Sequence, residues 1–134
     1  MRLYENIEWQ PGELKHQGII GSPDGYGEYE GRGAREDYEL TIEEFKYTHK
    51  SSRGDDKTPD SIKNPCDDWL WRNQILCYMA MHPAKPTLVR WHVCYGNGNY
   101  VYPLTEKYIR YLCQAERAEI DNCWRMVVKN KFIV

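Results

Sequence analysis

The sequence contains no long apolar run. No window approaches the roughly 18 uninterrupted apolar residues that a membrane-spanning helix needs, and the opening Met-Arg-Leu-Tyr-Glu-Asn has no apolar segment of the signal-peptide kind. We therefore expect a cytoplasmic protein with no membrane partner. The 134 residues, 41% of them hydrophobic, suffice for one compact core and are too few for two ordinary domains, so we expect a single domain over residues 1–134.

Closely spaced cysteine and histidine pairs are also missing. The chain has five cysteines and four histidines, with no Cys-x-x-Cys and no His-x-x-x-His spacing, so a structural zinc site is not indicated. An odd cysteine count without a signal peptide argues against a disulfide framework. We expect reduced, mostly buried thiols at Cys66, Cys77, Cys94, Cys113 and Cys123.

An excess of positive charge is absent as well. The formal net charge is −2, whereas proteins that depend on phosphate contacts usually carry a basic domain or stripe. Basic side chains nevertheless gather in one stretch, which begins at Lys46 and continues through His49, Lys50, Arg53 and Lys57. This stretch is either a phosphate-binding segment or an ordinary solvated loop, and the sequence does not decide between them.

Acidic and basic residues stand on a strand-like segment from Tyr38 to Tyr47. Side chains two apart on a strand share a face, so Glu44 and Lys46 are expected to be neighbours, and Glu43 is expected to face solvent on the other side. Upstream, the stretch from Leu14 to Gly21 contains a short apolar run, Gly-Ile-Ile-Gly, and ends in Ser-Pro-Asp-Gly, which predicts Asp24 at the end of a strand. The glycine-rich stretch 25–33 that follows is expected to be a hairpin tip.

The second half of the chain predicts two helices and two strands. Asn64-Pro65 predicts a helix start and Pro83 a helix end near Met81; this helix carries Gln74 and Tyr78 within an apolar stripe. Strands are expected over 87–95 and 100–102, joined by an Asn-Gly turn. A second helix is expected from Thr105, packed across the sheet. The fold class is therefore α/β (α+β), with a central mixed β-sheet flanked by helices.

Pro23-Asp24, Glu44-Phe45-Lys46 and the Gln-x-x-x-Tyr pair Gln74 and Tyr78, in this order, resemble the PD-(D/E)XK nuclease superfamily and its RecB-like, lambda-exonuclease-like branch. The resemblance covers roughly residues 18–102 and implies a restriction-endonuclease-like core. The family usually begins with a helix that often carries an extra acid. The short N-terminal stretch here predicts that this helix is reduced or absent, and Glu5, Glu8 and Glu13 all remain open as the extra acid.

The predicted site is catalytic and metal-dependent. Magnesium and manganese prefer oxygen ligands, which makes Asp24 and Glu44 the expected metal ligands; the resemblance adds the backbone carbonyl of Phe45. The ammonium group of Lys46 could orient water, hold the scissile phosphate or act as a base. The resemblance further implies that Gln74 positions substrate or water and that Tyr78 supports the site or contacts DNA.

These residues predict a Mg²⁺- or Mn²⁺-dependent deoxyribonuclease, with exonuclease preferred to endonuclease. The resemblance implies a partner that is single- or double-stranded DNA, and a role in recombination, repair or phage defence inside a bacterial cell or phage-infected host. The small size favours a homo-oligomer, because one domain offers little surface to hold a duplex. Two alternatives stay open: a catalytically inactive DNA-binding or protein-interaction module of the same fold, and an oligomeric inhibitor or accessory protein. Trp69, Trp71, Trp91 and Trp124 are expected in the core.

Overall fold

The longest strand, β5 (Tyr38–Thr48), forms the middle of the sheet in the computed structural model, which describes residues 7–30, 38–48, 65–95 and 107–130. The segment is rich in β-branched and aromatic residues, which favour a pleated strand. Its alternation directs Ile42 and Glu44 to one face, where they are 0% and 1% exposed. The strand predicted over 38–47 is therefore confirmed.

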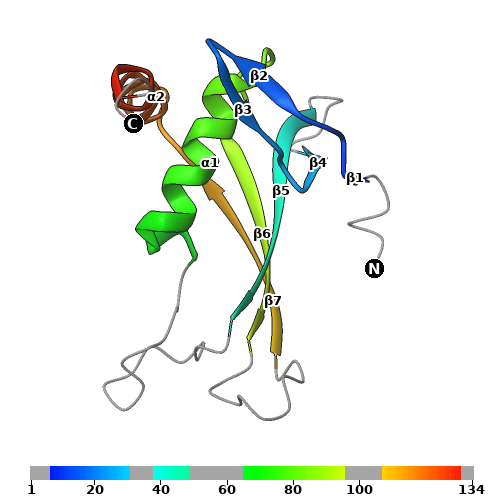
Figure 1. Ribbon diagram of the computed structural model, residues 1–134. Helices are drawn as coiled ribbons and strands as arrows, with labels where there is room; N and C mark the ends of the chain where they lie inside the picture. The colour runs from blue at the N-terminus through cyan, green and yellow to red at the C-terminus, as the bar shows by residue number, and fades with distance from the viewer. Residues whose placement is uncertain (1–6, 31–37, 49–64, 96–106, 131–134) are drawn as a thin grey trace, which may run out of the picture.

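A five-stranded mixed sheet is built around β5, in the order β1–β4–β5–β6–β7. Strand β4 (Gly25–Glu30) pairs antiparallel with β5, and β6 (Leu88–Tyr95) pairs parallel with it. A parallel pair needs a long crossover, and the helix α1 (Trp69–Met81) lies within it. The two edges are β1 (Glu8–Trp9) and β7 (Lys107–Gln114). The expected fold class, a mixed sheet with flanking helices, is confirmed (Figure 1).

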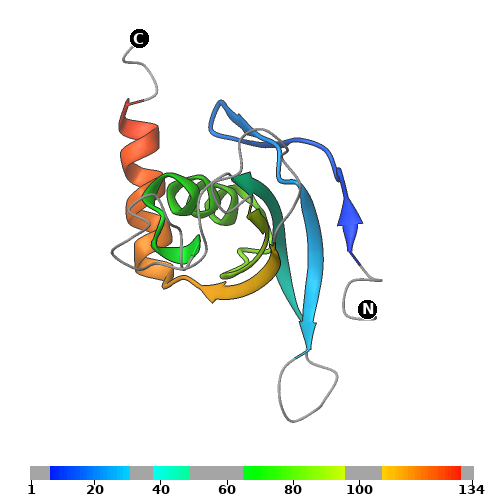
Figure 2. The same ribbon diagram turned by 90° about the horizontal axis from the view of Figure 1, so that it is seen from below.

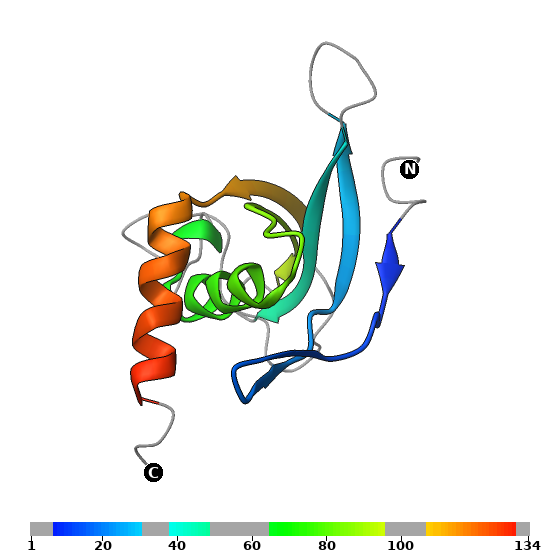
Figure 3. The ribbon, with the colours of Figure 1, turned by 90° about the horizontal axis from the view of Figure 1, so that it is seen from above.

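The sheet curves around α1, and the second helix, α2 (Arg117–Asn130), lies on the far side of α1 from the sheet (Figures 2 and 3). The core forms where α1 meets the strands, with Ile75 and Met79 buried against Ile42, Trp91 and Val93. Burying side chains of this size stabilises the fold by roughly 1.5–3 kcal/mol each. Because α2 packs on α1, the prediction that this helix packs across the sheet was wrong.

The start of α1 differs from the prediction. A short 3₁₀ turn, η2 (Pro65–Asp67), comes first, and the helix is capped by Asp68, whose side chain accepts a hydrogen bond of 3.0 Å from the backbone N–H of Trp71. Asn64, the predicted cap, lies outside the described residues. The predicted end at Met81 is confirmed.

The segment Lys107–Gln114 is strand β7 rather than the first half of a helix. Tyr108, Ile109 and Tyr111 have aromatic and β-branched side chains that favour a strand, and β7 pairs antiparallel with β6. The helix begins only at Arg117. Thr105 and the strand expected over 100–102 lie outside the described residues.

The N-terminal part forms strands that the sequence pattern did not separate. The run expected as one strand from Leu14 turns at Gln17 and Gly18, which have φ angles of 52° and 80°, and so forms a hairpin of β2 (Leu14–His16) and β3 (Ile19–Gly21). Residues 25–30 of the glycine-rich stretch expected as a hairpin tip form strand β4, and residues 31–33 lie outside the described residues. No helix lies between residues 7 and 30.

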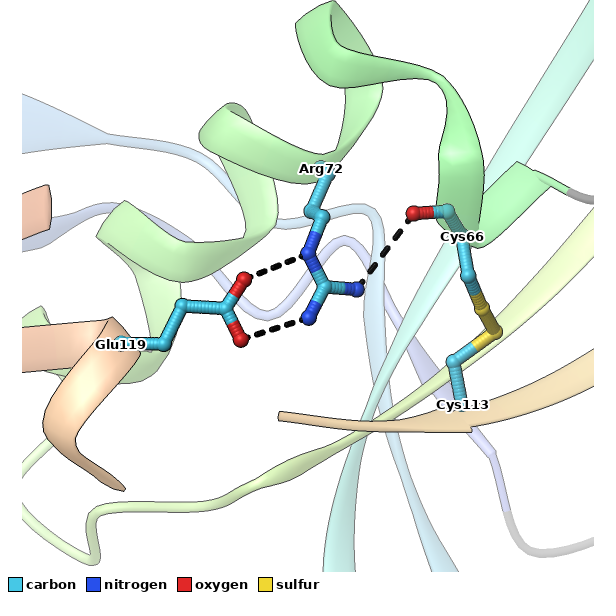
Figure 4. Close-up of a disulfide and its surroundings, with 4 residues drawn as sticks. All are labelled: Cys66, Arg72, Cys113 and Glu119. Atoms are coloured by element: carbon cyan, nitrogen blue, oxygen red, sulfur yellow. Dashed lines mark hydrogen bonds and ion pairs between the residues drawn. A yellow bond between two sulfur atoms is a disulfide. The ribbon is translucent and has the colours of Figure 1, made fainter. Parts of the chain in front are cut away.

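A disulfide joins Cys66 in η2 to Cys113 in β7 (Figure 4), so the prediction of reduced thiols was wrong for this pair. The two residues are 47 apart in the sequence, and only the packing of η2 against the sheet brings their Cα atoms to 6.3 Å. Beside the disulfide, the guanidinium of Arg72 on α1 makes two hydrogen bonds of 2.6 Å to the carboxylate of Glu119 on α2. The Arg72–Glu119 ion pair therefore holds α1 against α2, while the disulfide holds η2 against β7. Within the described ranges, no helix has the length and apolarity that crossing a membrane requires.

Candidate functional site

Asp24 and Glu44 lie beside each other at one end of the sheet. The antiparallel register pairs Gly25 with Glu43, which sets the residue before β4 next to Glu44. The backbone N–H of Asp24 donates a 3.1 Å hydrogen bond to Oε1 of Glu44, and the N–H of Phe45 donates a 2.9 Å bond to Oδ2 of Asp24. The two acids are thus linked reciprocally. The strand β3 ends at Gly21, just before Ser-Pro-Asp-Gly, as predicted, and Asp24 lies in the turn between β3 and β4, next to Glu44 as expected.

Glu44 is an unusual carboxyl group because it is almost fully buried. Its pKa is raised from 4.5 to about 8, chiefly by burial and in part by the negative charge of Asp24. The N–H of Asp24 and the ammonium of Lys46 act in the opposite direction. In the absence of a cation, the protonated form of Glu44 is therefore the favoured one at neutral pH.

A chain of hydrogen bonds runs from β5 to α1. Nζ of Lys46 donates to Oε1 of Gln74 at 2.9 Å, and Nε2 of Gln74 donates to the hydroxyl of Tyr78 at 3.0 Å. Residues four apart on a helix share a face, so the exposed Gln74 reaches the buried Tyr78 one turn along α1. The predicted apolar stripe is thus exposed at its start, where Leu70 is 62% exposed. Nζ of Lys46 also lies 5.8 Å from the ring centroid of Trp71.

Tyr78 ties this chain to the acids. Burial raises the pKa of its hydroxyl, and the charge of Glu44 raises it further, while hydrogen bonds from Gln74 and from the backbone of Ser22 lower it. Its ring passes so close to Gly21 that a Cβ built there would lie 2.7 Å from a ring carbon. All five predicted side chains of the site, together with the backbone of Phe45, are therefore brought together.

The donor atoms suit a hard divalent cation. Asp24 and Glu44 offer carboxylate oxygens and Phe45 a backbone carbonyl, and magnesium binds through one or two carboxylates and completes its shell with water. Across residues 7–30, 38–48, 65–95 and 107–130, no three His, Cys, Asp or Glu side chains gather closely enough to hold a metal by themselves. A cation here would therefore depend on the carbonyl, water and substrate oxygens as well.

An open cleft of about 850 Å³ lies next to Asp24. Trp9, Pro23 and Phe45 form apolar parts of its wall, and Gln10 and Glu13 add polar groups. Of the three acids considered for the upstream position, Glu13 lines this cleft with Asp24; Glu8 lies in β1, opposite Tyr26, and Glu5 lies outside the described residues.

Glu43 is buried, so its predicted exposure to solvent was wrong. It is 0% exposed, and its carboxylate contacts Arg90 at 2.9 Å, His92 at 2.7 Å and the hydroxyl of Thr41. The reason is that this second face of the sheet is also covered. Trp9 lies across Gly25, where a Cβ would come within 2.8 Å of the indole, and meets His92 edge-on at 5.4 Å.

The tryptophans divide differently from the prediction. Trp91 is buried, and Trp71 and Trp124 pack against the core, but Trp69 is 69% exposed, so its predicted core position was wrong. Trp9, which the sequence patterns did not single out, is 45% exposed beside the cleft. The basic residues from His49 to Lys57 lie outside the described residues.

Fold and site together define an α+β protein with a paired carboxylate at the end of a mixed sheet. No protein-family model matches the chain, and no curated protein matches it. A solved structure described as "Crystal structure of SSO0001" is similar, with 12% sequence identity and a TM-score of 0.44, over 95% of this chain and 52% of that one. The chain thus spans about half the length of that neighbour.

Proposed function

We propose that this protein is a metal-dependent nuclease that hydrolyses phosphodiester bonds in DNA. One observation supports this above the rest: five side chains from the turn before β4, from β5 and from α1 belong to one continuous constellation of hydrogen bonds and charges, namely Asp24, Glu44, Lys46, Gln74 and Tyr78. Three separate short motifs meet there in the order that the PD-(D/E)XK resemblance implies.

The residues have distinct roles in this proposal. Asp24 and Glu44, with the carbonyl of Phe45, would hold Mg²⁺ or Mn²⁺, which would supply charge neutralisation at the phosphate and lower the pKa of a bound water. Gln74 fixes the Lys46 ammonium through the 2.9 Å hydrogen bond, which keeps a positive charge beside the carboxylates for the scissile phosphate. Tyr78 holds Gln74 in place through the 3.0 Å bond. Preorganised donors of this kind typically contribute about 10²–10³ in rate.

Digestion of end-labelled linear DNA in Mg²⁺ or Mn²⁺ tests the proposal. Asp24→Asn and Lys46→Ala are expected to lower the turnover number by at least about 100-fold. Glu28→Gln, which removes an exposed acid from β4, and Lys129→Ala, which removes an exposed lysine from α2, are matched controls that should keep wild-type activity. Wild-type protein that leaves single- and double-stranded DNA intact with both metals would rule out the nuclease.

The finer expectations belong to this proposal as well. We favour end-directed cleavage, because the Gln-x-x-x-Tyr pair resembles that of end-processing nucleases, and a role in recombination, repair or phage defence. Labelled linear and closed circular DNA of the same sequence separate the two modes, since an exonuclease degrades only the linear form.

A second function is favoured by one specific observation. The described residues hold only two clustered carboxylates, without the third acidic side chain that would make a metal centre by itself. A non-catalytic DNA-binding or protein-interaction module of the same fold is consistent with that. Calorimetric titration with Mn²⁺ separates the two functions. A nuclease should release or absorb heat on binding Mn²⁺, and Asp24→Asn should abolish this heat. In an inactive module, wild type and Asp24→Asn should give the same titration.

A further inference from the structure

The cleft beside Asp24 combines two aromatic walls with an acidic border. Trp9 and Phe45 are 45% and 48% exposed, so both rings offer apolar surface to a ligand in the cleft. Among the described residues that line the cleft, none is Lys or Arg, whereas Glu13 and Asp24 are acidic. The negative charge there would repel a phosphate group, whereas an uncharged planar ring would not be repelled.

Trp9 is held in position although half of it faces solvent. Its partner in the sheet is Gly25, and the indole occupies the space that a Cβ at Gly25 would need, at 2.8 Å. The edge-on contact with His92 at 5.4 Å supports the indole from a second side. An exposed aromatic ring whose orientation is already fixed loses little conformational entropy when a ligand stacks on it.

The backbone at Gln10, directly after Trp9, also helps to fix the position of Trp9 beside Asp24. Gln10 adopts a φ of 56°, a left-handed conformation that is unfavourable for an L-residue. Its N–H donates a 2.7 Å hydrogen bond to the carbonyl of Asp24, which holds this turn against the proposed metal ligand. The aromatic wall is thereby coupled to the acid pair through the main chain.

From this geometry we infer that the cleft binds one unpaired nucleobase of the nucleic-acid substrate, stacked on Trp9, next to the phosphate that is cut. The inference rests on the proposed nuclease function and deepens it. The carboxylate of Glu13 and the amide oxygen of Gln10 can accept hydrogen bonds from the exocyclic amino groups of a base. A paired base is stacked inside the duplex and cannot enter, so the substrate is a single strand or a frayed end.

The test measures binding without cleavage. The probes are a fluorescein-labelled 12-nucleotide single-stranded DNA and the same strand carrying 2-aminopurine at one position at a time, in Ca²⁺, with gel analysis to show that the strand stays intact. We expect wild-type protein to quench 2-aminopurine strongly at one position. Trp9→Ala should remove that quenching and raise Kd by about tenfold or more. Trp9→Phe, which keeps a ring, should stay within about threefold of wild type.

Trp69→Ala is the matched control, because Trp69 is even more exposed and lies on α1, outside the cleft. It should change neither the Kd nor the quenching. Phe45→Ala removes the other wall and should weaken binding as well, so the inference stays testable if Trp9→Ala does not fold. Wild-type affinity in both Trp9→Ala and Phe45→Ala, or no quenched position, would overturn it.

The two proposals fail in different ways. If wild-type protein digests DNA in Mg²⁺ and the Trp9→Ala variant binds the single strand as tightly as wild type, the nuclease proposal stands and the base-site proposal is wrong. If wild-type protein does not digest DNA but its quenching of 2-aminopurine depends on Trp9, the base-site proposal stands and the nuclease proposal is wrong.

Discussion

Replacing Glu44 by glutamine gives a direct measure of how the buried carboxyl group acts on stability. In the metal-free protein its pKa is about 8 against an ordinary value of 4.5. The folded state therefore keeps this proton to higher pH than the unfolded chain does. The favourable contribution of the protonated group is complete below about pH 4.5 and is lost as the pH rises toward 8.

The size of the effect follows from the shift. Each pKa unit corresponds to about 1.4 kcal/mol, so the free energy of unfolding should fall by up to about 5 kcal/mol between pH 4.5 and pH 9, and by about 3 kcal/mol on reaching pH 7. Glutamine has nearly the same shape, can accept the same hydrogen bond from Asp24 and does not ionise. Glu44→Gln should therefore match wild type near pH 5 and become the more stable protein as the pH rises.

Urea denaturation from pH 5 to pH 9 in EDTA provides the assay. Groups that titrate in both proteins cancel in the difference between wild type and Glu44→Gln, and Glu28→Gln should follow the wild-type curve. If the proposed metal site is correct, adding Mn²⁺ at pH 8 should stabilise wild type and leave Glu44→Gln unchanged, because the ion would take the place of the proton on Glu44. Parallel pH curves for wild type and Glu44→Gln would refute the argument from burial.

Two further substitutions examine the surroundings of the site. Glu43→Ala removes the carboxylate that Arg90 and His92 contact, and it should lower the free energy of unfolding by roughly 3 kcal/mol or more in urea denaturation. Glu43→Gln should be less destabilising. A loss below about 1 kcal/mol in Glu43→Ala would show that these contacts contribute little to stability. Gly21→Ala places a methyl group 2.7 Å from the ring of Tyr78 and should cost about 1–3 kcal/mol and reduce DNA digestion as strongly as Tyr78→Phe does. Unchanged stability and activity in Gly21→Ala would show that the ring moves aside freely.

The site was predictable where its geometry is local. Strand alternation in β5 places Glu44 beside Lys46, and helical spacing in α1 places Gln74 beside Tyr78, so both pairs follow from periodicity. The proximity of Asp24 to Glu44 depends on strand register across 20 residues, and only the resemblance to a known family suggested it.

The errors share a physical cause, which is dependence on distant partners. Glu43 is buried because Arg90, 47 residues away, lies opposite it on β6, and alternation within one strand cannot show whether the second face is covered. Lys107–Gln114 contains apolar residues at helical as well as strand spacing, and pairing with β6 decides for the strand. Trp9 lies in a strand of two residues, which is too short for any periodicity. The glycine at position 25, which leaves one face of β4 bare, was the available signal.

The parallel pairing of β5 with β6 has a consequence for how the protein folds. The β4–β5 hairpin closes a short loop and can bring Asp24 to Glu44 early, whereas β6 reaches β5 only after α1 has been laid down between them. Closing that longer loop is entropically unfavourable until the crossover packs, and topologies of this kind fold slowly. Lys46 and Gln74, 28 residues apart, meet only when α1 packs against β5, so we expect the hydrogen bond that holds Lys46 to form with the packing of this crossover helix.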